Sequence, residues 1–121
     1  MSQNLEDSPL WKQSLTLTKE LRATIKGVFR YDEHYTFADP LERNAIQLTS
    51  DIASALGKGS EALVDYQYAR GHLFSIKGLV LVAQEYGYLK DVASLLTDME
   101  LMHRAINHEI ERLEDEHEAK L

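Results

Sequence analysis

The hydrophobic pattern is strongest between residues 60 and 87. Apolar positions there recur at alternating steps of four and three residues, as on one face of an α-helix; they are Ala62, Tyr66, Ala69, Leu73, Ile76, Val80 and Ala83. From Leu79 to Ala83 every residue is apolar. A helix that is apolar all round must be covered on both faces. The pattern therefore predicts a helix with one face in a core and a second face against another subunit.

Three further segments have the helical period. The only two prolines, Pro9 and Pro40, stand where helices can begin, because proline has no N–H group to leave unpaired in a first turn. Gly59 and Gly87 stand where helices can end, because glycine adopts the left-handed C-cap conformation without a Cβ clash. The sequence thus predicts four helices, near residues 9–31, 40–57, 60–87 and 90–117.

These segments favour one small bundle. A chain of 121 residues makes one domain, and short connections place consecutive helices antiparallel. We expect an all-α, antiparallel up-down-up-down four-helix bundle over residues 1–121. In the last helix, the stripe with steps of three and four residues consists of Leu96, Met99, His103, Ile106, Ile110, Leu113 and His117, and the final turns should extend past the core. Tyr35 and Phe37 are expected to close one end of the bundle.

Two glycines inside the third helix suggest how copies of the chain meet. Gly71 and Gly78 are seven residues apart and share one helix face. Each costs about 1 kcal/mol relative to alanine, and their shared face suggests close approach by a neighbouring helix. We expect a homo-oligomeric ring. Its candidate interface residues are Gly71, Gly78, Leu79, Leu81 and Val82.

Charge is divided unevenly along the chain. The net charge is −7, yet residues 10–31 hold five bases and one acid, whereas residues 98–121 hold eight acids and three bases. Lys12, Lys19 and Lys26 are seven apart on one helix face, which is either an ordinary solvated face or a basic strip for phosphate groups. The candidate nucleic-acid-binding residues are Lys12, Lys19, Arg22, Lys26, Arg30 and Arg43.

The composition favours a soluble cytoplasmic protein. The chain has no cysteine, which excludes disulfides and thiolate metal sites and fits a reducing compartment. No apolar run approaches membrane-spanning length. The first nine residues lack the basic and apolar regions of a secretory signal.

Residues with catalytic or metal-binding chemistry are sparse. Glu100 with His103 and Glu114 with His117 have the Glu-x-x-His spacing of di-iron bundles, but such sites need the two pairs on different helices. We therefore expect no metal and no cofactor, a hydrogen-bonded His103 at the edge of the core, and a solvated His117. No nucleophile has a recognisable acid–base partner, so we expect no enzyme and no catalytic residues. Asp51 and Asp65 are expected to pair with arginine or lysine.

Four short segments carry a resemblance to a known family. The chain resembles the small bacterial four-helix-bundle proteins encoded within intervening sequences of 23S ribosomal RNA genes, which are related to accessory proteins of diversity-generating retroelements. The matching segments are Glu42-Arg43-Asn44-Ala45, Ser50-Asp51-Ile52-Ala53-Ser54-Ala55, Ala69-Arg70-Gly71-His72 and Gly87-Tyr88-Leu89. Glu42 replaces the first of two arginines that are typical of the family.

The resemblance implies a bundle that assembles into a ring, usually a pentamer, with a role centred on nucleic acid and without enzyme activity. Two functions remain open. The first is a homo-oligomeric accessory protein that binds RNA or DNA, or a nucleic-acid-handling protein, through the basic residues of the first helix. The second is an acidic protein-interaction scaffold with no direct nucleic-acid binding, which the net charge and Glu42 favour.

Overall fold

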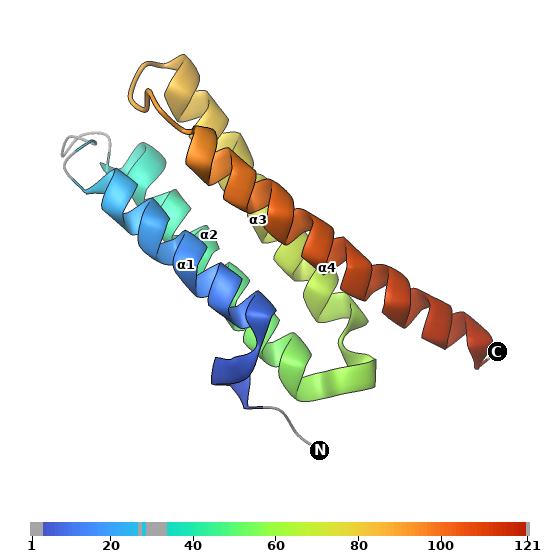
Figure 1. The fold of residues 1–121 in the computed structure, drawn as a ribbon. Helices are drawn as coiled ribbons and strands as arrows, with labels where there is room; N and C mark the ends of the chain where they lie inside the picture. Colours follow the sequence, from blue (N-terminus) through green and yellow to red (C-terminus); the bar gives the residue numbers. More distant parts are fainter. Residues whose placement is uncertain (1–3, 27, 29–33, 121) are drawn as a thin grey trace.

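The structure is a computed structural model that describes residues 4–26, 28 and 34–120. Within these residues the chain forms four α-helices and no strand (Figure 1). The helices are α1 (Pro9–Ile25), α2 (Asp39–Lys58), α3 (Leu63–Glu85) and α4 (Ala93–Ala119). Three short elements flank them, the 3₁₀ turns η1 (Leu5–Asp7) and η4 (Gly59–Glu61) and the π-helical turn η3 (His34–Ala38). The predicted all-helical, four-helix fold is confirmed.

Consecutive helices run antiparallel, and each helix packs against two others (Figure 1). The packed pairs are α1 with α2, α2 with α3, α3 with α4, and α4 with α1. Helices α1 and α3 therefore lie on one diagonal of the bundle, and α2 and α4 lie on the other. As a consequence, the outward faces of α1 and α3 point away from each other.

Most of the predicted helix boundaries have a visible physical cause. The Ser8 hydroxyl accepts a hydrogen bond from the Trp11 backbone N–H at 3.2 Å and caps α1, with Pro9 in the first turn. Gly59 ends α2 with φ of 60°, and Gly87 follows α3 with φ of 85°. Both angles lie in the left-handed region, where glycine avoids a Cβ clash.

Other boundaries differ from the prediction. Helix α1 ends at Ile25, and Lys26 leaves the helix with φ of −64° and ψ of 116°. In the sequence Gly27 comes next, and glycine is a poor helix former; residues 29–31 lie outside the described part. Helix α4 begins at Ala93, three residues after the predicted start. Its first N–H group donates to the Asp91 carboxylate at 3.4 Å, a local contact that competes with helix formation.

The core lies along the bundle axis and contains all seven apolar positions predicted for the third helix. Their exposed fractions range from 0% at Ala62 to 4% at Tyr66. Phe37 is buried at the end of the bundle, where its ring lies 6.0 Å from that of Tyr86 and 5.3 Å from that of Tyr88, centroid to centroid. The predicted closure of this end is confirmed for Phe37, whereas the side chain of Tyr35 lies outside the described part.

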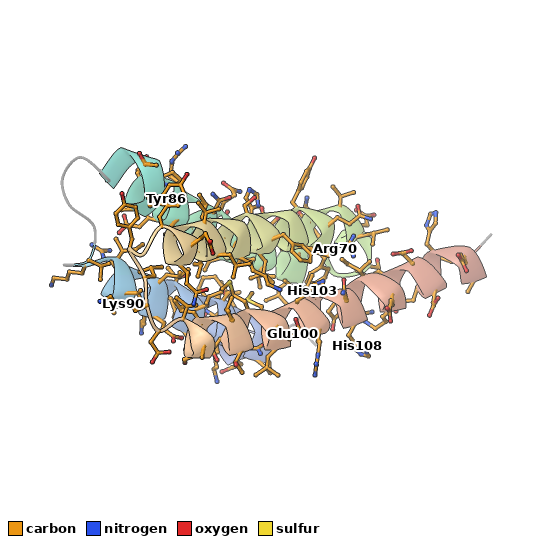
Figure 2. All side chains as sticks on the ribbon, turned by 90° about the horizontal axis from the view of Figure 1, so that it is seen from above. Arg70, Tyr86, Lys90, Glu100, His103 and His108 are labelled. Atoms are coloured by element: carbon orange, nitrogen blue, oxygen red, sulfur yellow. The ribbon has the colours of Figure 1, made fainter. Side chains whose placement is uncertain are left out.

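The buried stripe of α4 differs from the prediction in its first half. Leu95 and Met102 are buried where Leu96 and His103 were expected. The predicted and observed positions are neighbours in sequence, so both sets keep a helical spacing, and only packing against α3 and α1 decides between them. His117 is exposed, as predicted, because Leu113 is the last buried residue. Residues 114–120 form an overhang past the core, as expected (Figure 2).

None of the helices in the described residues combines the length and the apolar character that crossing a membrane requires.

Candidate interaction surfaces

The outward face of α1 carries the predicted basic residues. Lys12, Lys19, Arg22 and Lys26, called the basic strip below, are all exposed. The buried stripe of the same helix is on its other side and consists of Leu10, Ser14, Leu17, Leu21 and Ile25. Among residues 4–26, 28 and 34–120, no acid forms an ion pair with any member of the basic strip. Within the described residues, the positive charge of the basic strip is therefore not neutralised by ion pairs.

The two other predicted basic residues do not extend this strip. Arg30 lies outside the described residues. Arg43 projects from α2, where its guanidinium lies 3.2 Å from the Asp39 carboxylate, four residues earlier. Arg43 is thus on a different helix from the strip, and an acid on its own helix offsets its charge.

The outward face of α3 has a second, uncharged stripe. Val64, Tyr68, Gly71, Ser75, Gly78 and Val82, called the outer stripe below, follow steps of four and three residues and are all exposed. Val64, Tyr68 and Val82 have 55, 61 and 45% of their area exposed. Phe74 and Leu81 lie at its edge and are 49 and 40% exposed. No charged residue occurs in the outer stripe, and its middle is made of small residues.

The outer stripe distinguishes α3 from the other helices. Ten large hydrophobic residues are exposed in the described part of the chain, and five of them lie within α3. Helices α1, α2 and α4 each contribute one, namely Leu15, Ile46 and Leu101. Contiguous exposed apolar area of this kind marks interaction sites, whereas single exposed apolar residues are ordinary.

Within one chain, no helix covers the two glycines. A Cβ atom added at Gly71 or at Gly78 would have no other atom within 4 Å. Close approach by another helix of the same chain is therefore wrong as an explanation of these glycines, because their face points outward. Of the other candidate interface residues, Leu81 and Val82 are exposed, whereas Leu79 is half-buried and packs against the core.

Polar contacts join α3 to α2. The carboxylate of Asp51 is buried and lies 2.7 Å from Nδ1 of His72, and it accepts a hydrogen bond from Gln47 at 3.1 Å. The carboxylate of Asp65 on α3 lies 3.1 Å from the ammonium of Lys58 on α2. The predicted pairing of Asp65 with an arginine or lysine is confirmed. The prediction of an arginine or lysine partner is wrong for Asp51, whose partner is a histidine 21 residues away on another helix.

A second polar cluster joins α3 to α4 (Figure 2). The Arg70 guanidinium donates a hydrogen bond to the side-chain oxygen Oδ1 of Asn107 at 2.9 Å. The side-chain nitrogen Nδ2 of Asn107 lies 2.9 Å from Nε2 of His103. The His103 ring also packs edge-on against Phe74, with 4.7 Å between the centroids. The prediction of a hydrogen-bonded His103 at the edge of the core is confirmed. Among the described residues, no three acidic or histidine side chains gather where they could hold a metal ion.

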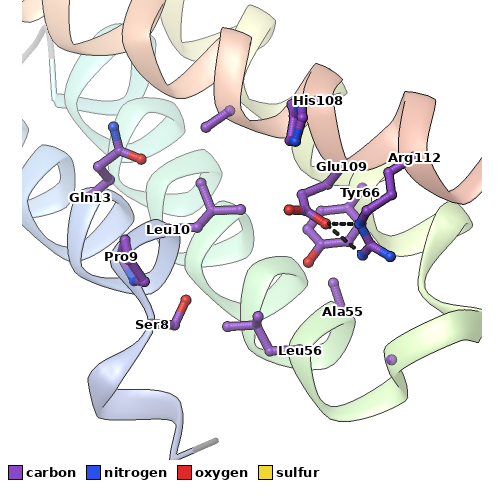
Figure 3. A pocket seen from close by; sticks show the side chains of 12 residues that line it. Ser8, Pro9, Leu10, Gln13, Ala55, Leu56, Tyr66, His108, Glu109 and Arg112 are labelled. Atoms are coloured by element: carbon purple, nitrogen blue, oxygen red, sulfur yellow. Dashed lines mark hydrogen bonds and ion pairs between the residues drawn. The ribbon is translucent and has the colours of Figure 1, made fainter.

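A cavity lies at the end of the bundle near the N-terminus (Figure 3). Its volume is about 490 Å³, and its walls come from both helix pairs. Tyr66 of α3 is 4% exposed and points into the cavity, and the phenol makes no hydrogen bond within the described residues (Figure 3). Burial, then the charge of Glu109, raises the pKa of Tyr66 above its usual 10.0. The sequence pattern indicates Tyr66 only as a core residue.

An ion pair stands at the rim of this cavity. Arg112 donates two hydrogen bonds to Glu109, at 2.7 and 3.1 Å (Figure 3). It donates a third to Glu116 at 2.8 Å. These contacts, led by the hydrogen bond to Glu109, raise the pKa of the Arg112 guanidinium. Two carboxylates therefore neutralise the one cation that lines the cavity.

No protein-family model matches the chain, and neither the curated proteins nor the solved structures contain a match. The resemblance to the proteins of ribosomal RNA intervening sequences therefore stays a prediction.

Proposed function

We propose that this protein is a non-enzymatic accessory protein that assembles with copies of itself through α3 and presents the basic strip of α1 to nucleic acid. The observation that carries the proposal is the opposite character of these two outward faces. One is uncharged and rich in small residues, and the other is basic and forms no ion pair with any acid of the described residues.

The outer stripe of α3 has the features of a helix–helix interface. Its steps of four and three residues give a continuous seam along the helix, the geometry by which paired helices interlock side chains. Gly71, Ser75 and Gly78 in its middle would let a second backbone approach closely. Val64, Tyr68 and Val82 would then bury apolar area that is now exposed, at about 25 cal/mol for each Å².

The diagonal arrangement keeps the two surfaces apart. Because α1 and α3 do not pack against each other, copies joined through α3 would leave the basic strip of each copy uncovered. The symmetry of a closed assembly would repeat the strip around its outside. The resemblance adds a pentamer as the expected ring size and a bacterial cytoplasm as the expected location.

The acidic net charge does not argue against a local basic surface. Several acids of α4 are already engaged, since Glu100 pairs with Arg104 at 3.2 Å and Arg112 pairs with Glu109 and Glu116. Local charge at the contact face, rather than the mean charge, sets the attraction for phosphates. A basic strip of four unpaired cations is suited to the backbone of RNA or DNA.

A salt titration tests the nucleic-acid role. An RNA hairpin and a DNA duplex would be titrated by fluorescence anisotropy at 50 and at 200 mM salt. Each lost phosphate contact should reduce the logarithmic salt slope by about 0.9. We expect steep salt dependence in the wild type and loss of binding in the triple variant Lys19→Glu, Arg22→Glu, Lys26→Glu.

A matched control carries the same change in charge away from α1. The control variant is Lys90→Glu, Arg104→Glu, Lys120→Glu, in which all three residues are exposed. It should retain most of the wild-type affinity. The absence of binding at 50 mM salt, or equal losses in the two variants, would contradict a role for the basic strip.

The overhang of α4 favours a second candidate, the acidic scaffold. Residues 114–120 are exposed on every side and include Glu114, Asp115, Glu116 and Glu118. A basic partner protein could bind there while the same α3 assembly holds the copies together. If the protein bound no nucleic acid but captured polylysine, and lost it on removal of residues 114–121, the scaffold function would replace the nucleic-acid role.

A further inference from the structure

The cavity at the N-terminal end of the bundle has a composition that the assembly and the basic strip do not explain. Its volume of about 490 Å³ falls in the range of small-molecule sites, about 300–1,000 Å³. Leu10, Leu56 and Ala105 are among its apolar walls, and Gln13, Tyr66 and Glu109 are among its polar groups. Mostly apolar walls with a few polar groups are typical of such sites.

Tyr66 is the polar group that points to a ligand. Its side chain is more than nine-tenths buried, yet no described residue accepts or donates a hydrogen bond at its hydroxyl. The hydroxyl itself opens onto the cavity, so it can donate a hydrogen bond to a molecule that occupies the cavity. A phenol is protonated at neutral pH, so the Tyr66 hydroxyl can donate a hydrogen bond, and burial raises its pKa further.

The charges around the cavity limit what it can bind. Arg112 is already bound by Glu109 and Glu116, so it offers no net positive charge to an anion. Glu109 also lies close enough to raise the pKa of Tyr66 through its negative charge. A carboxylate or phosphate placed at the hydroxyl would be repelled in the same way.

We propose that this cavity binds an uncharged small molecule that has an apolar body and one oxygen that accepts a hydrogen bond from the Tyr66 hydroxyl. The apolar body lies against Leu10, Leu56 and Ala105. The buried face of α3 thus holds the ligand, while the outer stripe on its opposite face remains available to other copies.

The test uses the full chain and three small probes of similar size. Cyclohexanone has the required oxygen, methylcyclohexane lacks it, and cyclohexanecarboxylate carries a negative charge. Binding would be followed by changes in amide and methyl NMR signals of the cavity walls. We expect saturable binding of cyclohexanone, weaker binding of methylcyclohexane, and none of the carboxylate.

Two variants locate the binding and its hydrogen bond. Tyr66→Phe keeps the ring but removes the hydroxyl, so it should weaken cyclohexanone roughly three- to tenfold, the usual value of one hydrogen bond, and leave methylcyclohexane unchanged. Ala105→Leu fills the cavity from a helical position and should abolish binding of both probes. Ala23→Leu, at an exposed position of α1, is the matched control and should change neither.

Three results would overturn the proposal. The first is no saturable binding of cyclohexanone up to 10 mM, roughly a −2.7 kcal/mol limit, which would mean that the cavity holds only water. The second is binding that survives Ala105→Leu or is unaffected by Tyr66→Phe. The third is a set of NOE contacts from Met1–Gln3 to the cavity walls in the free protein, which would show that the chain fills its own cavity.

Discussion

The outward faces of α1 and α3 differ although both are built on a seven-residue repeat. On α1 the repeat places Lys12, Lys19 and Lys26 in solvent, opposite a buried apolar stripe. On α3 the same repeat places Gly71 and Gly78 in a stripe without charge, also opposite a buried stripe. Helix α1 follows the ordinary rule of one buried and one solvated face. Helix α3 departs from this rule, because its exposed face carries apolar and small residues without charge. This exposed apolar face is the basis of the proposed assembly.

The two stripes of α3 should respond differently to truncation. Ile76 is fully buried, so Ile76→Ala should lower the free energy of unfolding by about 2–5 kcal/mol at any protein concentration. Val82→Ala, on the outer stripe, should change it by less than about 0.5 kcal/mol in dilute, dissociated protein. Urea unfolding monitored by circular dichroism measures both. Similar losses in the two variants at low concentration would mean that the stripes are not functionally distinct.

A charge on the outer stripe should separate the copies. Val82→Lys would bury an unpaired ammonium in the proposed interface, and we expect the assembly to dissociate at least tenfold more readily, about 1.4 kcal/mol or more. Ile46→Lys places the same charge on α2, at a residue that is 62% exposed. This control should leave the assembly intact. Sedimentation velocity distinguishes the variants. If Ile46→Lys dissociated the protein and Val82→Lys did not, the interface would lie on α2.

The two glycines give a test in which folding and assembly change in opposite directions. An added Cβ at Gly71 or Gly78 meets no described atom beyond the adjacent backbone of α3, so Gly71→Ala with Gly78→Ala should stabilise the isolated bundle by about 1 kcal/mol for each site. The same methyl groups should keep a second helix from approaching closely and weaken the assembly. Thermal melts across a concentration series would show both effects. A variant that is more stable and equally well assembled would refute close packing at the glycines.

The sequence allowed accurate prediction where the pattern had one solution. All seven core positions of α3 follow from their spacing, because no neighbouring set fits it as well. In α4 either member of the pairs Leu95–Leu96 and Met102–His103 fits the helical spacing. The sequence favoured Leu96 and His103, whereas tertiary packing buries Leu95 and Met102. The outer stripe was predicted only in part. The sequence indicated Gly71, Gly78 and Val82, whereas the exposure of Val64 and Tyr68 became evident only in the structure.

Features that depend on separate helices could not be predicted. Asp51 is buried because His72 and Gln47 satisfy its carboxylate, and His72 lies 21 residues away on α3. The cavity beside Tyr66 arises where helix ends of the two pairs leave space around small residues such as Ala55 and Ala105. Neither feature leaves a periodic signal in the sequence.

The smallest predicted effect concerns the seam between α1 and α4. Glu20 is the only acid on α1, and its pKa is raised above 4.5, mainly by its hydrogen bond with Asp98. A raised carboxyl pKa favours the fold below pH 4.5, and this contribution is lost as the pH rises through the folded-state pKa. Asp98→Asn should therefore slightly raise the free energy of unfolding at pH 7, with the gain disappearing below pH 4.5. Asp115→Asn, on the overhang, is the control and should have no effect at either pH.

The most direct test of the α3 assembly is the mass of the wild-type protein in solution. Light scattering after size exclusion, from 1 to 100 µM chain, would be compared with the 13.8 kDa of one chain. We predict a single species whose mass is a whole multiple of 13.8 kDa and falls to that of one chain in Val82→Lys. A wild-type mass of 13.8 kDa at every concentration would contradict it, because the outer stripe would then remain in water.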